Sequence, residues 1–179
     1  MLNRRLSAAL IALVPAAALL MAAPPASAGA PDLTCLPLSS ETVIYDPPID
    51  STVTDTDLSI DTNYGPCTST SNPSVTSGSR HIDITLPRSC SQILQTAPTT
   101  YTITWNTGQT STITGTRTNT LSGAVLVVTV NGSVTAGLFS GDTVVQTISG
   151  VVPGLPGCLL GLGTVSSITG QTTLSLTSP

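Results

Sequence analysis

The sequence predicts an all-β fold in which two sheets pack as a sandwich that is fastened by two disulfide bonds. Three observations predict it. Residues 29–179 contain 31 threonines and 20 serines, and threonine, being β-branched, favours strands over helices. Apolar and polar residues alternate in many short segments, which is the pattern of a strand with one buried face. Four cysteines, an even number, all follow residue 28.

The first 28 residues have the features of a secretory signal peptide. Arg4 and Arg5 precede an apolar stretch of 18 residues, and a run of small residues ends at Ala28. An uncleaved anchor is the alternative, because this stretch almost spans a bilayer, but Pro15 and the later prolines favour cleavage. We therefore expect cleavage after Ala28 and a single secreted, extracellular domain over 29–179.

Eight or nine short strands are expected, each from alternation or from a run of β-branched residues. The segments are, in chain order, 42–45, 51–60, 81–86, 101–105, 110–118, 124–137, 143–149, 164–168 and 172–177. The one helical pattern is a single turn at Ser91–Gln95. Short strands separated by proline and glycine turns are typical of a two-sheet, immunoglobulin-like sandwich with Greek-key connections. A closed barrel is the alternative.

Alternation also assigns the faces of the strands. Tyr101, Ile103 and Trp105 lie on one face of their segment, and we expect Trp105 to be the one large anchor of a core of Val, Leu and Ile. Leu58 and Ile60 belong to the inner face of theirs, opposite a row of aspartates.

Asn131-Gly132 is a strong hairpin signal, yet we expect the strand to continue through it. A turn there would mix apolar and polar partners on both faces. A continuous strand keeps Val128, Val130 and Val134 on one buried side. Gly132 then marks a bulge or a close approach of two backbones.

The cysteines indicate two disulfides, because the chain is expected to be exported. Three pairings are open, and we favour Cys67–Cys90, which closes a short excursion, together with Cys35–Cys158, which ties the two ends of the domain. A zinc site is the competing interpretation, but the sequence has no CxxC pair and a single histidine.

The net charge of residues 29–179 limits the classes of partner that the chain can bind. Residues 29–179 carry three arginines, no lysine and nine acids, a net charge of −6. Such a chain lacks the cations that bind phosphate backbones or anionic lipid. We expect no nucleic-acid partner, and no membrane association once the signal is removed.

Two groups of residues could carry chemistry, and neither forms a recognised motif. His81 and Asp83 share a strand face, as two members of a triad could, but no nucleophile motif accompanies them. Six acids within 41–61 could pair for glycoside hydrolysis. Three of them, with Asn63, could bind calcium (Asp55, Asp57 and Asp61), although their spacing fits no calcium loop. The six acids are Glu41, Asp46, Asp50, Asp55, Asp57 and Asp61. We expect no catalytic, cofactor-binding or metal-binding residue, no cofactor, and no enzymatic activity.

Three segments resemble a known group of proteins: Tyr101–Ile113, Asn131–Thr143 and Tyr64–Ser69. The group consists of short, exported, Thr-rich actinobacterial proteins with one β domain, and the resemblance covers most of 29–179. It implies secretion and a single domain, and it carries over no catalytic residue. A looser architectural likeness is to the enediyne-carrying apoproteins, which are small, acidic, two-disulfide sandwiches with different cysteine spacings.

The expected function is that of a secreted, non-enzymatic β module with a structural, surface-associated or binding role, its partner being a cell-surface or other extracellular protein. One alternative is a protease inhibitor that presents Thr68–Ser89, with Arg80, as a disulfide-braced loop. The other is a small-molecule carrier, which would need an apolar cleft.

Overall fold

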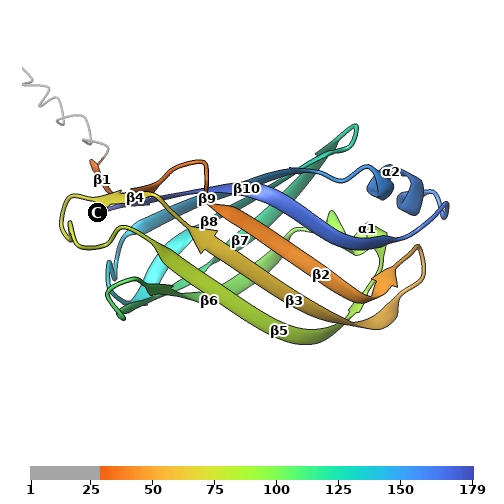
Figure 1. The fold of residues 1–179 in the computed structure, drawn as a ribbon, viewed down its shortest axis with the longest axis horizontal. Helices are drawn as coiled ribbons and strands as arrows, with labels where there is room; N and C mark the ends of the chain where they lie inside the picture. The colour runs from red at the N-terminus through yellow and green to blue at the C-terminus, as the bar shows by residue number, and fades with distance from the viewer. Residues whose placement is uncertain (1–28) are drawn as a thin grey trace, which may run out of the picture.

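The computed structural model describes residues 29–179, and the expected signal peptide lies outside them. The described residues form ten strands in one antiparallel sheet, together with two short helices (Figure 1). The strands are β1 (Pro31–Cys35), β2 (Ser40–Ile49), β3 (Thr54–Tyr64), β4 (Cys67–Ser69), β5 (Gly78–Arg88), β6 (Ala97–Trp105), β7 (Thr110–Ser122), β8 (Val125–Gly137), β9 (Thr143–Val151) and β10 (Val165–Thr177). The helices are α1 (Cys90–Ile93) and α2 (Gly154–Leu159).

The sheet closes on itself and forms a barrel of eight strands. The strand order is β2-β3-β5-β6-β7-β8-β9-β10, and β10 pairs with β2 from Gln171–Ser40 to Val165–Ile49. β1 pairs with both β10 and β4, and it extends the sheet at one end of the barrel. Within 29–179, no helix is long and apolar enough to cross a membrane.

The all-β class is thus confirmed, but the immunoglobulin-like sandwich is corrected to a barrel. Neighbours along the chain pair with one another from β5 to β10, so the connections are up-and-down rather than Greek-key. A barrel and a sandwich both bury one face of each strand, so alternation along single strands is the same in the two folds. The pairing of β2 with β10 distinguishes them, and it joins strands that are far apart in the sequence.

The expected strands are present, and most are longer than expected. The two C-terminal segments form one strand, β10, while β1, β4 and α2 were not expected. β8 runs straight through Asn131-Gly132, which confirms the continuous strand. Gly132 lies opposite Gly115 of β7, where a Cβ atom would be 2.6 Å from the Gly115 Cα. The expected close approach of two backbones is therefore confirmed.

Two apolar clusters fill the ends of the barrel. The first surrounds Trp105, whose side chain is 2% exposed and donates an indole hydrogen bond to the Ser111 hydroxyl at 2.8 Å. Tyr64 and Phe139 pack against its ring system. The second cluster joins α1 and α2 to the strands and includes the fully buried Leu155. Trp105 is confirmed as a core anchor, and the middle of the barrel lies between the clusters.

All four cysteines form disulfides, but the expected pairing is wrong. The bonds are Cys35–Cys67 and Cys90–Cys158. Cys35 and Cys67 are direct partners in the β1–β4 ladder, with Cα atoms 4.0 Å apart. Cys90 begins α1 and Cys158 belongs to α2, so the second bond joins the helices. The pairing was missed because neither the β1–β4 ladder nor α2 was expected.

Candidate ligand-binding cavity

The barrel wall is open between β5 and β6. These strands pair at only two positions, Gly78–Trp105 and Ser79–Thr104, whereas β3 and β5 pair along their whole length. Gly78 allows the contact at that end, since a Cβ atom there would lie 2.6 Å from the Trp105 ring. Beyond it the two strands diverge, and the short α1 connects their far ends. The remaining edges of β5 and β6 flank an opening into the barrel.

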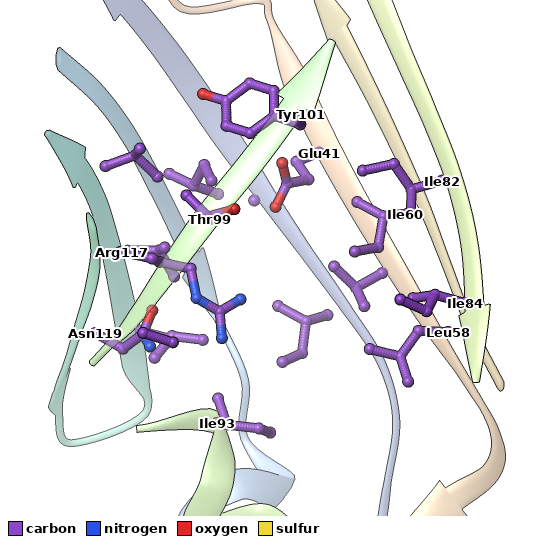
Figure 2. A pocket seen from close by; sticks show the side chains of 18 of the residues that line it. Glu41, Leu58, Ile60, Ile82, Ile84, Ile93, Thr99, Tyr101, Arg117 and Asn119 are labelled. Carbon is purple, nitrogen blue, oxygen red and sulfur yellow. The ribbon is translucent and has the colours of Figure 1, made fainter. Parts of the chain in front are cut away.

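A cavity of about 340 Å³ lies behind this opening. Inward side chains of all eight barrel strands contribute to its wall, together with Ile93 of α1. Figure 2 shows the apolar side of the wall, formed by β3 and β5: Leu58, Ile60, Ile82 and Ile84. Ile84 is 43% exposed, so the apolar wall continues to the surface of the molecule. The inner face expected for Leu58 and Ile60 is confirmed.

A buried polar network closes the cavity toward the Trp105 cluster. Arg80 and Glu41 form an ion pair whose side chains are 8% and 11% exposed. The Thr62 hydroxyl accepts a hydrogen bond from Arg80 Nε at 3.1 Å and donates one to Glu41 at 2.9 Å. The Arg80 guanidinium also lies 4.3 Å from the centroid of the Tyr101 ring. These charges satisfy one another, so this end of the cavity needs no ligand group.

Three buried tyrosines supply neutral polar groups to the interior: Tyr64 and Tyr101 in the Trp105 cluster, and Tyr45 in the cluster that contains Leu155. Tyr101 donates a hydrogen bond to the Gln146 side chain, which in turn donates to the Thr172 hydroxyl at 3.2 Å. Burial raises the pKa of Tyr64 to about 12, and it also raises the pKa of Tyr101. Burial likewise raises the pKa of Tyr45 to about 12. The phenols therefore stay protonated at neutral pH.

Arg117 differs from Arg80 because its charge is not matched. It extends from β7 into the cavity, as Figure 2 shows. No ion pair joins it to another residue of 29–179. Burial lowers the pKa of its guanidinium, and the positive charge of Arg88 acts in the same direction. The interior thus holds a cation that the described part of the chain leaves without a counter-charge.

Asn119 lies two residues further along β7 and lines the same cavity. Its side-chain amide donates a hydrogen bond to the Gln95 carbonyl at 2.8 Å, which fixes the orientation of the group. Its Oδ1 is buried and has no hydrogen-bond partner among the described residues. An unmatched cation and an unmatched acceptor therefore occur together.

His81 and Asp83, the two possible triad members, lie on the outer face of the barrel. His81 Nδ1 is 2.7 Å from Asp61 Oδ1, and its Nε2 is 2.9 Å from Asp83 Oδ2. These hydrogen bonds raise the pKa of the imidazole. Because both ring nitrogens face carboxylates, His81 has no free nitrogen with which to take a proton from a serine.

The six acids of 41–61 are divided between the two faces. Glu41 points inward to Arg80, whereas Asp55 and Asp57 are exposed on β3, and Asp57 accepts a hydrogen bond from Thr85 at 2.5 Å. Over 29–179, no cluster of His, Cys, Asp and Glu is arranged to hold a metal ion. The arginine expected on an inhibitory loop, Arg80, is buried on β5, and no disulfide closes 68–89.

Sequence reasoning missed Arg117 and Asn119, yet a signal was present. Both point inward from β7, on the same face of the strand as Ile113. Arg80 and Arg88 likewise flank the inward residues of β5. An arginine on the apolar face of an expected strand, as Arg117 is in 110–118, indicates a polar element inside the fold, which a solid core would not contain.

The chain matches no protein-family model, and neither the curated proteins nor the solved structures contain a significant match to it. The resemblance to exported Thr-rich actinobacterial proteins, and the looser one to enediyne-carrying apoproteins, therefore stay predictions.

Proposed function

We propose that this protein is a non-enzymatic carrier that binds a small apolar ligand inside the barrel. The observation that supports the proposal is the cavity of about 340 Å³ with an apolar wall and an opening between β5 and β6. Small-molecule sites have volumes of roughly 300–1,000 Å³, and they combine an apolar lining with a few placed polar groups. Eight-stranded barrels are wide enough to hold one such ligand.

Apolar burial would supply most of the affinity. Each methylene group moved from water into the cavity contributes about 0.8 kcal/mol, so a ligand with roughly eight of them gains about 6 kcal/mol before the cost of association. The ligand would also cover the exposed part of Ile84. Binding of this kind needs no nucleophile and no metal.

The proposal includes secretion. Two disulfides are consistent with an extracellular protein, because such bonds persist in oxidising compartments. A signal peptide that ends at Ala28 would export the chain. The protein would then carry or sequester its ligand outside the cell, alone or for a cell-surface partner.

A fluorescence titration with N-phenyl-1-naphthylamine tests the proposal, because this neutral apolar dye becomes bright when it leaves water. We expect saturable binding of one dye per chain. Val128 lines the cavity, so Val128→Phe should weaken dye binding about tenfold or more by filling the space. The matched control is Val145→Phe on the outer face of β9, where Val145 is 48% exposed, and it should bind like the wild type. Absence of saturable binding, or equal loss in both variants, would contradict the proposal.

A further inference from the structure

We propose that the ligand of this cavity is an amphiphile with one anionic group, a carboxylate in the simplest form, which binds Arg117. The inference rests on the proposed function and specifies the class of ligand. It is supported by the distribution of charge in the molecule, by the surroundings of Arg117 and by the position of Asn119.

The distribution of charge separates the interior from the surface. All three arginines of 29–179 line the cavity, whereas Glu41 is the one acid among the nine that does so. Since Glu41 pairs with Arg80, two positive charges remain in excess inside, those of Arg88 and Arg117. Both are half-buried, so each is partly removed from water, which is unfavourable for a cation without a partner. The acidic outer surface would offer a carboxylate to a fully exposed arginine. This placement fits a ligand that brings negative charge into the cavity.

The groups that surround Arg117 do not neutralise it. Arg80 and Arg88, both on β5, have the same charge as Arg117. Tyr45 of β2 is protonated at neutral pH, because its pKa is raised to about 12. Glu41 is held by Arg80 and Thr62. The planar guanidinium of Arg117 therefore keeps its donors for a group that enters the cavity, and its geometry matches an oxyanion.

Asn119 adds a second polar group to the part of the cavity wall that contains Arg117. Its unpartnered Oδ1 can accept a hydrogen bond from a ligand hydroxyl or from a water molecule beside the anionic group. Figure 2 shows Arg117 and Asn119 on the side of the cavity opposite Ile60, Ile82 and Ile84. The head of the ligand would thus lie at β7, with its apolar chain along β3 and β5.

Competition for the bound dye tests this inference with probes that share a chain and differ in the head group: decanoate, decanol, decylamine and decyl sulfate. We expect wild-type protein at low salt to bind decanoate about tenfold or more tighter than decanol, which is the effect of one charge-assisted hydrogen bond. Decylamine should bind most weakly. Decyl sulfate measures whether the site requires a carboxylate or accepts other oxyanions, and tight binding of either anion supports the inference.

Variants of Arg117 test whether this residue causes the preference for an anionic head group. Arg117→Gln should bring the decanoate-to-decanol affinity ratio close to one, and Arg117→Lys should restore part of it. Thr118→Glu is the matched control, because it changes the net charge in the same direction from the exposed outer face of β7; it should keep most of the ratio.

Equal binding of decanol and of both anions by the wild type, or an anion-to-decanol ratio unchanged in Arg117→Gln, overturns the inference while the carrier function stands. Failure of the dye itself to bind overturns the proposed function instead. The wild-type comparison requires no variant, so a poorly folded Arg117→Gln protein leaves the inference falsifiable.

Discussion

Arg80 and Glu41 stabilise the end of the cavity that adjoins the Trp105 cluster. Their ion pair is almost fully buried, and Thr62 bridges the two side chains. Removal of one partner from a buried pair leaves a desolvated charge, which typically costs about 3–5 kcal/mol.

We therefore predict that Arg80→Met lowers the free energy of unfolding by about 3 kcal/mol in urea denaturation. Combining it with Glu41→Gln should recover part of the loss, because the unpaired carboxylate is then absent. Arg88→Met is the control, since Arg88 has no ion pair in 29–179, and it should change stability by less than about 1 kcal/mol. Similar losses in the two single variants would contradict the role of the pair.

The buried tyrosines make stability depend on alkaline pH. The pKa values of Tyr45 and Tyr64 are raised from 10.0 to about 12 by burial, so the unfolded chain loses these protons before the folded chain does. The free energy of unfolding should be constant just below pH 10.0 and should fall as the pH rises toward about 12. Denaturation curves across this range measure the fall, and Tyr45→Phe should make it shallower. A free energy of unfolding that is flat or rising there would show that the phenols are solvated.

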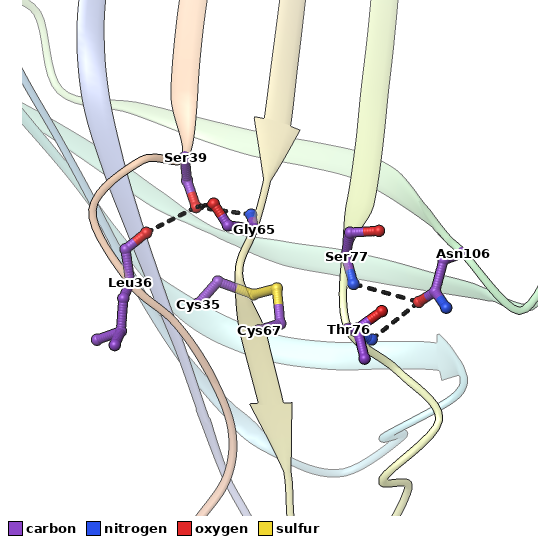
Figure 3. Close-up of a disulfide and its surroundings, with 8 residues drawn as sticks. All are labelled: Cys35, Leu36, Ser39, Gly65, Cys67, Thr76, Ser77 and Asn106. Carbon is purple, nitrogen blue, oxygen red and sulfur yellow. Dashed lines mark hydrogen bonds between the residues drawn. A yellow bond between two sulfur atoms is a disulfide. The ribbon is translucent and has the colours of Figure 1, made fainter.

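At the scale of elements, each disulfide secures one end of the barrel. Figure 3 shows Cys35–Cys67 beside the loop where the Ser39 hydroxyl donates to the Leu36 carbonyl at 2.9 Å and accepts from the Gly65 amide at 2.8 Å. Cys90–Cys158 lies at the other end and joins α1 to α2. Ile93 of α1 lines the cavity, so this second bond also supports the ligand site.

Removal of the two bonds should therefore have different consequences. On the chain-entropy model each bond contributes about 4 kcal/mol, because the closed loops are long. Replacing Cys90 and Cys158 with Ser should weaken dye binding as well as stability. The matched double variant at Cys35 and Cys67 should lower stability while it leaves dye affinity close to the wild-type value. Peptide mapping without reduction checks the pairing itself, and a Cys67–Cys90 peptide would contradict it.

The elements also show which features could be predicted from the sequence. Alternation located the strands and their inner faces, as at Leu58, Ile60 and Trp105, because a residue's own neighbours determine that pattern. The pairing of β2 with β10 and the Cys90–Cys158 bond depend on contacts between distant segments, which no local pattern specifies. Arg117 was predicted to lie in a strand, but its environment depends on side chains from β2, β5 and β7 together.

At the scale of the whole molecule, the apolar residues are divided between two clusters at the ends. The space between them is only partly filled, and inward glycines of β9 and β10, Gly150 and Gly170, line it without side chains. The low aromatic content, 3% of the chain, fits this arrangement, because few large side chains are present to fill the barrel. An open interior is consistent with selection for binding as well as for stability.

The molecule also carries its charges in an unusual distribution, because all three arginines but only one of the nine acids, Glu41, line the cavity. A strongly negative surface would keep the protein soluble and would repel anions at a distance. An anionic amphiphile would therefore associate faster as salt screens the surface, while the buried contact with Arg117 is screened less.

Intermolecular NOE measurements on the isotope-labelled protein with unlabelled decanoate test the claim that the ligand lies inside the barrel. We predict contacts from the decanoate chain to the methyl groups of Ile60, Ile82, Ile84 and Val128, which line the cavity. Contacts confined to the exposed methyl groups of Val53, Val145, Leu160 and Leu162 on the outer surface would contradict the claim.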